Sequence, residues 1–128
     1  MPIVFSMRES TVTVGKSGEE KACTYLKILN YDIIARNFRR RGGEIDIIAK
    51  DKEILVFIEV KTLPSGNIET LGHELNLRKQ KRIIETSKRF LEINRQYNDS
   101  IIRFDVLVID MPGFPSVYHI KDAFSELV

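Results

Sequence analysis

An apolar run at residues 54–61, Ile-Leu-Val-Phe-Ile-Glu-Val-Lys, predicts a buried β-strand. Two opposite charges, Glu59 and Lys61, lie two residues apart near its end. Because side chains alternate between the two faces of a strand, these two side chains point the same way. Burying an ion costs several kcal/mol, so an ion pair on an apolar strand indicates a function at this position.

Apolar residues at helical spacing predict two helices. The first extends from Ser17 to about Asn30, and its opening residues, Ser17 to Glu20, have the form of a capping box. The second begins just after Leu75, ends at about Asn94 and is amphipathic. Its apolar arc is expected to pack against a sheet. The opposite arc is basic and contains Arg78, Lys81, Arg82, Lys88 and Arg89.

Strand patterns account for most of the remaining chain. A turn at Gly42-Gly43 and a hairpin tip at Asp51-Lys52 separate the first three strands, and a last helical turn is expected near Asp122. The expected strands are residues 33–37, 44–50, 53–62, 101–109 and 117–120. The core order is therefore αβββαβ, which predicts an α/β fold. A single domain spans residues 1–128, with residues 1–14 as a candidate flexible amino-terminal segment.

Size and composition are consistent with that fold. A chain of 128 residues suits one domain, and shares of 43% hydrophobic and 30% charged residues are typical of a globular protein. No apolar run approaches the ~20 residues that a membrane span needs, so no membrane association is expected. The amino terminus lacks the pattern of a secretory signal, and Cys23 is the only cysteine. A cytoplasmic location is therefore expected.

The net charge of +2 does not by itself identify a nucleic-acid partner. Basic residues are nevertheless clustered, first at Arg36 and Arg39–Arg41 before the glycine turn, and again from Arg78 to Arg82. The guanidinium group suits phosphate because it donates hydrogen bonds in a planar fork. Each cluster taken alone fits a solvated surface equally well.

The hairpin tip at Asp51-Lys52 brings further acids to the face of Glu59 and Lys61. In that register Glu44 lies opposite Glu59, and Asp46 lies on the same face. Crowded carboxylates raise one another's pKa unless a cation lies between them. Carboxylate oxygens are hard ligands, so the expected cation is Mg²⁺ or Mn²⁺ with several waters retained.

The first helix offers another acid. On a helical wheel Glu19 falls at the border of the apolar stripe, whereas Glu20 points to the opposite, exposed side. Glu20 also has a role as the capping-box partner of Ser17. Glu19 is therefore the candidate site residue, and a surface ion pair is its alternative role.

Several short motifs resemble the YraN-like bacterial family, over a span from about Gly15 to Phe124. Its members are regarded as predicted endonucleases with the restriction-endonuclease-like PD-(D/E)XK fold, similar to archaeal Holliday junction resolvases. The resemblance implies a three-layer fold in which helices flank a mixed central β-sheet. The motifs are Gly18-Glu19 with Ala22 and Tyr25-Leu26, Arg36 to Arg39, Gly43 to Ala49, Val56 to Thr62, Lys79 with Arg82-Ile83, Arg103 to Val106 and Ile120 to Phe124.

Carried over residue by residue, this resemblance implies a metal-dependent nuclease site. Asp46 matches the metal-binding aspartate, and Glu59 and Lys61 match the E-x-K signature. The two acids would hold Mg²⁺ together with the backbone carbonyl of Val60. Lys61 would orient or help deprotonate the attacking water. Glu19 matches a glutamate of the first helix that would complete a second metal site or position water.

The resemblance also implies a nucleic-acid partner, DNA that is branched or otherwise distorted. Ile45 departs from the broader superfamily, which often has proline before the aspartate, but proline supplies no ligand. Glu44 is a further candidate metal ligand. Resolvase-like chemistry on two strands would favour a homodimer. Phosphate contacts are expected from Arg39, Arg40, Arg41, Lys79 and Arg82.

Other polar residues have simpler roles. No histidine or cysteine lies near His73 or His119 at ligand spacing, so surface or packing roles are expected for both. Cys23 is expected to be a small packing residue. Asp105, inside an apolar strand, fits either a structural ion pair or a supporting role next to the site.

Two alternatives to an endonuclease remain. One is a module that keeps the fold and binds nucleic acid or a protein without catalysis. Such a module would gain little from converging acids beside phosphate. The other treats Glu59 and Lys61 as a solvated ion pair on an exposed sheet face. The strand is apolar on both of its faces, which argues against that interpretation.

Overall fold

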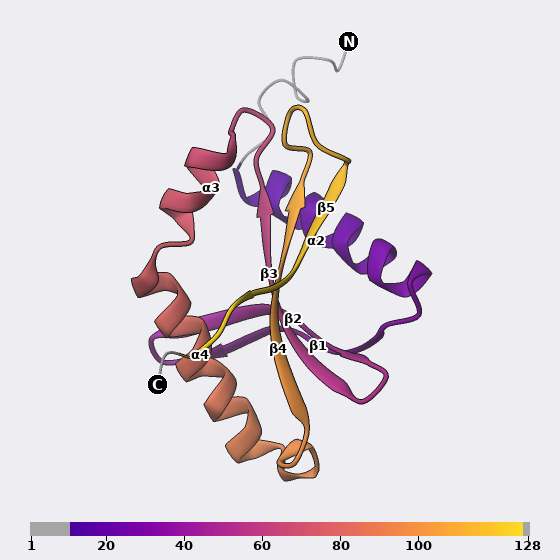
Figure 1. The fold of residues 1–128 in the computed structure, drawn as a ribbon, viewed down its shortest axis with the longest axis vertical. Coiled ribbons are helices and arrows are strands. Elements are labelled where there is room, and N and C mark those ends of the chain that lie inside the picture. Colours follow the sequence, from indigo (N-terminus) through magenta and orange to yellow (C-terminus); the bar gives the residue numbers. More distant parts are fainter. Residues whose placement is uncertain (1–10, 127–128) are drawn as a thin grey trace.

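The computed structural model describes the backbone of residues 11–126 and the side chains of residues 15–126. Within this range a mixed five-stranded sheet has helices on both faces (Figure 1). None of the described helices is long and apolar enough to cross a membrane. The elements are α2 (Thr11–Ile28), β1 (Asp32–Arg40), β2 (Gly43–Asp51), β3 (Ile54–Thr62), α3 (Ile68–Glu74), α4 (Leu77–Ile93), the 3₁₀ helix η1 (Arg95–Tyr97), β4 (Ile101–Ile109) and β5 (Val117–Phe124).

The sheet has the order β1-β2-β3-β4-β5. Strands β3 and β4 are parallel, and all other neighbours are antiparallel. A parallel pair needs a crossover connection, which α3 and α4 provide. Strand β3 therefore lies in the centre, with both faces covered, as its apolar sequence predicts.

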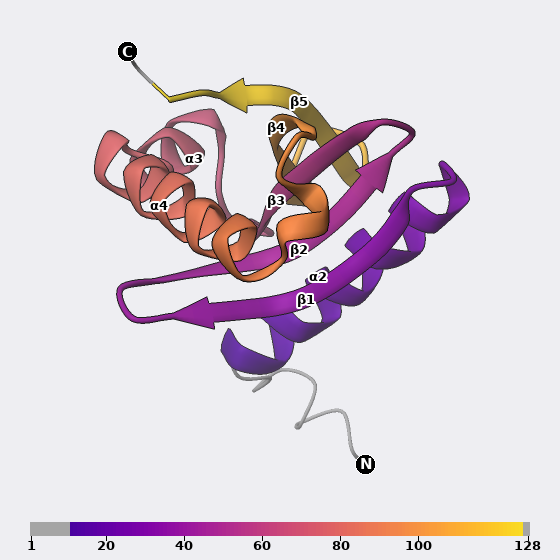
Figure 2. The same cartoon turned by 90° about the horizontal axis from the view of Figure 1, so that it is seen from below.

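The helices divide the core into layers, and Figure 2 shows the sheet between α2 and α4. On one face Leu26 of α2 packs with Ile47 and Ile58. On the other face Phe90 of α4 packs with Phe57. The predicted three-layer α/β fold is therefore confirmed, as is the apolar face of α4 (Ile83, Ile84, Ser87 and Phe90 are buried).

Three predicted elements are wrong in detail. Helix α2 begins at Thr11, so Ser17 lies inside the helix and caps nothing; residues 1–10 of the expected amino-terminal segment lie outside the described range. The expected loop before α4 contains the helix α3, whose N-cap Asn67 accepts a hydrogen bond from the Thr70 N–H at 3.0 Å. Strand β5 continues past Asp122, where a helical turn was expected, with a left-handed residue at that position (φ 53°).

The β2–β3 hairpin turns at Lys52-Glu53, one residue later than predicted. Asp51 pairs with Ile54, so the predicted register, with Glu44 opposite Glu59, is wrong by two residues. The first turn residue has a left-handed φ of 56°, as primed hairpin turns require. A shift of two residues preserves the alternation, so residues 47–51 of β2 keep their predicted faces, whereas Ile45 lies on the face opposite to that of Ile47.

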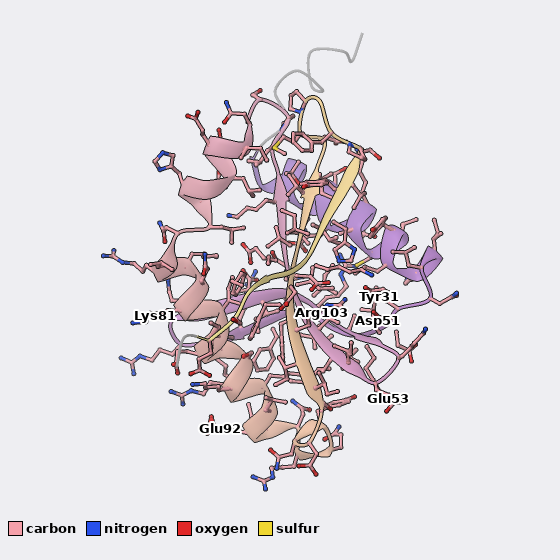
Figure 3. All side chains as sticks on the ribbon, viewed as in Figure 1. Tyr31, Asp51, Glu53, Lys81, Glu92 and Arg103 are labelled. Atoms are coloured by element: carbon pink, nitrogen blue, oxygen red, sulfur yellow. The ribbon has the colours of Figure 1, made fainter. Side chains whose placement is uncertain are left out.

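Asp105 of β4 is fully buried and bound on three sides. Arg103 Nε donates to it at 2.8 Å, His119 Nε2 lies 2.7 Å away, and the Asp122 N–H donates at 3.0 Å. Figure 3 shows Arg103 beside Tyr31, whose hydroxyl oxygen accepts a hydrogen bond from Arg103 Nη2 at 2.8 Å. Burial alone would raise the pKa of Asp105, but the hydrogen bonds from His119 and Arg103 lower it below its ordinary value. The contacts are those of a structural ion pair.

We expect Asp105→Asn to lower the free energy of unfolding by about 3 kcal/mol, because it removes the buried counter-charge of Arg103 and leaves that guanidinium only the more distant Asp51, at 3.4 Å. Urea denaturation at pH 7 measures the loss. The control Asp110→Asn removes an exposed pair with Lys21 and should cost less than about 1 kcal/mol. Because the folded pKa of Asp105 is lowered, the difference from wild type should persist above the unfolded pKa of 3.8 and shrink as the pH falls below it. Equal losses in the two variants would refute this role.

Candidate active site

Asp46 and Glu59 lie where strands β2 and β3 stop pairing. The last paired residues are Ile47 and Ile58. Beyond them, the Asp46 carboxylate accepts the backbone N–H of Val60 at 2.8 Å, in place of a ladder bond. In an extended strand the N–H and C=O of one residue point to the same neighbouring strand, so the Val60 carbonyl also faces this gap.

The β1–β2 ribbon is irregular at the same place. Ile45 and Ile47 are two residues apart but contact opposite core clusters, so β2 rotates about Asp46. Across from it in β1, Asn37 has a left-handed φ of 53°. A left-handed φ is uncommon for a residue other than glycine, and such residues cluster at active sites.

Asp46 has the carboxylate of the site whose pKa is shifted furthest from its ordinary value. Its partial burial, followed by the nearby charge of Glu59, raises the pKa of Asp46 from 3.8 to about 7. Glu44 contributes to the increase, and the hydrogen bond from the Val60 N–H opposes it. The loss of solvent and the nearby charge of Glu59 therefore both disfavour the ionised form of this carboxyl.

Two lysines flank Glu59, which is only 5% exposed. Its Oε2 lies 3.6 Å from the Nζ of Lys61, on the same strand, and 3.6 Å from the Nζ of Lys79, in the first turn of α4. Lys61 also contacts Glu74 of α3 at 3.2 Å. Lys79 was expected only as a phosphate contact, and Glu74 was not expected at all, because α3 was missed in the sequence.

Helix α2 brings Glu19 toward the same acids and leaves Glu20 exposed. Burial, followed by the charge of Asp46, raises the pKa of Glu19, and a hydrogen bond with the Asn37 side chain opposes that increase. Glu20 forms the closer ion pair with Arg36, at 2.9 Å compared with 4.0 Å for Glu19. Sequence reasoning gave no role to Asn37, although it lies inside a motif shared with the YraN-like family.

Gly18 allows α2 to lie directly against β3. A Cβ at this position would come within 3.3 Å of Thr62 Cβ and would collide with the Thr62 hydroxyl. At the preceding glycine of the helix, Gly15, a Cβ would have no atom within 4 Å. Close approach at Gly18 therefore fixes the position of the adjacent Glu19.

We expect Gly18→Ala to reduce the free energy of unfolding by about 1 to 3 kcal/mol, because Thr62 and the helix must move apart. Gly15→Ala, in the same helix, should be neutral or stabilising by up to about 1 kcal/mol, since alanine is the better helix former. Thermal unfolding of both variants compares the two effects. A loss in Gly15→Ala as large as in Gly18→Ala would argue against the close contact.

The donors at this site suit a hard divalent cation. Within residues 15–126, no three acidic, histidine or cysteine side chains come close enough to enclose a metal ion by themselves. Asp46, Glu59 and the Val60 carbonyl provide a smaller, all-oxygen set. Mg²⁺ commonly binds through one or two carboxylates and keeps several waters, so this set fits it. In this arrangement Glu19 and Glu44 act on Asp46 and on each other through their charge.

Comparison with known proteins places the chain in a family. The model of "Uncharacterised protein family UPF0102" matches residues 18–109, most of the chain. The chain belongs to the UPF0102 family. A UPF0102 protein of Treponema denticola is 44% identical over 125 residues, which cover 89% of this chain and 96% of the relative. A UPF0102 protein of Geobacter metallireducens is 42% identical over 113 residues, which cover 88% and 92%. The resemblance to the YraN-like family is thereby confirmed.

In this UPF0102 protein the five expected phosphate contacts fall into separate groups. Lys79 lies at Glu59, inside the acidic site. Arg39 is paired with Glu44 at 2.7 Å. The other three, Arg40, Arg41 and Arg82, line a cavity between the tip of the β1–β2 hairpin and α4.

Proposed function

We propose that this UPF0102 protein is a metal-dependent endonuclease that hydrolyses DNA phosphodiester bonds. The observation that supports it best is the juxtaposition of Asp46 and Glu59 at the gap between β2 and β3. Burial and the charge of Glu59 raise the pKa of Asp46, even though Lys61 and Lys79 lie near Glu59. A solvated surface ion pair would have neither this burial nor this crowding of acids.

The residues of the site suit the steps of phosphodiester hydrolysis. Asp46, Glu59 and the Val60 carbonyl would hold Mg²⁺ or Mn²⁺. When bound, the ion would lower the pKa of a water molecule and neutralise charge on the phosphate oxygens. Lys61 would orient the attacking water through its N–H groups, and Lys79 would oppose the negative charge that develops on the phosphate. Attack by water breaks one P–O ester bond and leaves a phosphate monoester and a free hydroxyl group.

The DNA substrate is inferred from the resemblance to archaeal Holliday junction resolvases. Branched or distorted DNA is the proposed preference, and a homodimer would allow two strands to be cut. Glu19, near Asp46, is proposed to complete a second metal site or to position water. Either role of Glu19 would add to the metal binding proposed for Asp46 and Glu59.

A nuclease assay tests the proposal. The full chain is incubated with linear, flapped and four-way DNA in the presence of Mg²⁺ or Mn²⁺, with EDTA as the control. We expect cleavage that requires the metal and stops with EDTA. Binding to these DNAs without cleavage of any of them would favour the non-catalytic module instead.

A further inference from the structure

A basic groove separates the tip of the β1–β2 hairpin from the outer side of α4; we call it the hairpin–α4 groove. It consists of two adjoining cavities of about 250 Å³ and 380 Å³, which share Arg40, Arg41 and Arg89. Figure 3 shows Lys81 at the outer edge of α4. The basic residues of the groove are Arg40, Arg41, Lys81, Arg82 and Arg89, and its acidic residues are Glu85 and Glu92.

The positive charge of the groove is largely unneutralised. Within residues 15–126, the only ion pair formed by its five basic side chains is that of Arg89 with Glu92, at 3.9 Å. Neighbouring basic residues outside the groove, such as Arg39 and Lys79, are paired with acids. The groove therefore presents cations that are available to an external anion.

Both walls of the groove are held in place. Gly43, at the base of the hairpin tip, packs so closely on α4 that a Cβ would collide with the Thr86 hydroxyl and come within 3.3 Å of the Arg82 carbonyl oxygen. The Arg40 guanidinium lies over the Phe38 ring, 4.7 Å from its centroid. The cationic side chains are thus arranged on two elements in direct contact.

We propose that the hairpin–α4 groove binds the sugar–phosphate backbone of a double-stranded DNA flank, away from the phosphate that is cut. Arginine and lysine side chains at this density favour phosphate. No aromatic side chain lines the groove, so it offers no platform on which unpaired bases could stack. A duplex backbone is therefore the better fit than a single strand.

Helix α4 connects the groove to the acidic site. Lys79, in its first turn, contacts Glu59, and Arg89 lies about ten residues further along the same helix. At 1.5 Å per residue this is about 15 Å. It corresponds to about four base-pair steps of 3.4 Å. The position of the groove relative to a cut phosphate rests on the proposed nuclease function. The proposal that the groove binds duplex DNA does not depend on cleavage.

Fluorescence anisotropy with the full chain in EDTA tests the groove without cleavage. The probes are a labelled 20-base-pair duplex and a 20-nucleotide single strand, at several salt concentrations. The groove variant combines Arg41→Ala, Lys81→Ala and Arg89→Ala. The control variant combines Lys27→Ala, Lys52→Ala and Arg95→Ala, which remove the same charge from exposed positions elsewhere.

We expect the groove variant to bind the duplex at least about tenfold more weakly than wild type. The slope of log binding constant against log salt concentration should become shallower by two to three, since each phosphate contact contributes about 0.9. The control variant should bind the duplex less than about threefold more weakly than wild type.

Three results would overturn the proposal: equal losses of affinity in both variants, tighter binding of the single strand than of the duplex by wild type, or no binding of the duplex. If the groove variant still cuts at saturating DNA, the two sites act separately. A wild type that binds duplex through the groove but never cuts it would refute only the nuclease.

Discussion

Asp46→Ala is expected to reduce metal-dependent DNA cleavage by at least about 1000-fold, which corresponds to about 4 kcal/mol of transition-state stabilisation. The substitution removes one of two carboxylates that would hold the ion, and the acceptor of the Val60 N–H. Single-turnover cleavage at saturating DNA and Mn²⁺ measures the loss. Circular dichroism checks that the variant remains folded.

Two further substitutions make this test specific. Lys61→Ala removes the ammonium beside Glu59 and should also reduce cleavage strongly. Glu20→Ala is a matched control for Glu19→Ala, because the two acids are adjacent in α2 but only Glu19 lies near Asp46. Glu20→Ala should keep nearly full activity. Cleavage that survives both Asp46→Ala and Lys61→Ala would show that the catalytic site lies elsewhere.

Asp46→Asn is expected to stabilise the metal-free protein at pH 8 by about 4 kcal/mol. The folded pKa of Asp46, about 7, lies above its ordinary value of 3.8, so ionisation opposes folding. The stability of wild type therefore falls as the pH rises from about 4 to about 7, and the full loss is present above pH 7. Asparagine keeps an acceptor for the Val60 N–H without the charge. The gain should be absent at pH 4, and urea denaturation at both pH values measures it.

Added Mn²⁺ should reverse the difference in stability between Asp46→Asn and wild type. The ion supplies the missing charge between Asp46 and Glu59, so at pH 8 it should raise the melting temperature of wild type and leave that of Asp46→Asn nearly unchanged. Asp110→Asn, at an exposed carboxylate, should respond to Mn²⁺ as wild type does. An Asp46→Asn variant that is less stable than wild type at pH 8 without metal would contradict the crowding of the two acids.

The fold was predictable where side-chain periodicity determines it. The apolar arc of α4, with Ile83 and Phe90, and the apolar sequence of β3 each indicated the correct element and the correct buried face. Helix α3 was missed because its seven residues bury only Leu71, which is too little for a helical period. The position of the β2–β3 turn depends on a left-handed backbone at Lys52, which its sequence does not signal.

The candidate site was predictable in part. Alternation along β3 placed Glu59 and Lys61 on one face, and the error of two residues in the hairpin register left the faces of residues 47–51 of β2 unchanged. The rotation of β2 about Asp46 depends on tertiary packing, as does the approach of Lys79 from α4. Contacts of that kind join elements far apart in the sequence, and no local pattern specifies them.

A crystal of the protein soaked in Mn²⁺ and measured for anomalous scattering tests the metal site most directly. The predicted result is one peak between the Asp46 and Glu59 carboxylates, about 2.1 Å from their oxygens, with the Val60 carbonyl as a further ligand. Its absence from Asp46→Asn crystals would tie the ion to that carboxylate. No peak at this position in wild type at millimolar Mn²⁺, or a peak only at other acids, would contradict the proposed metal site.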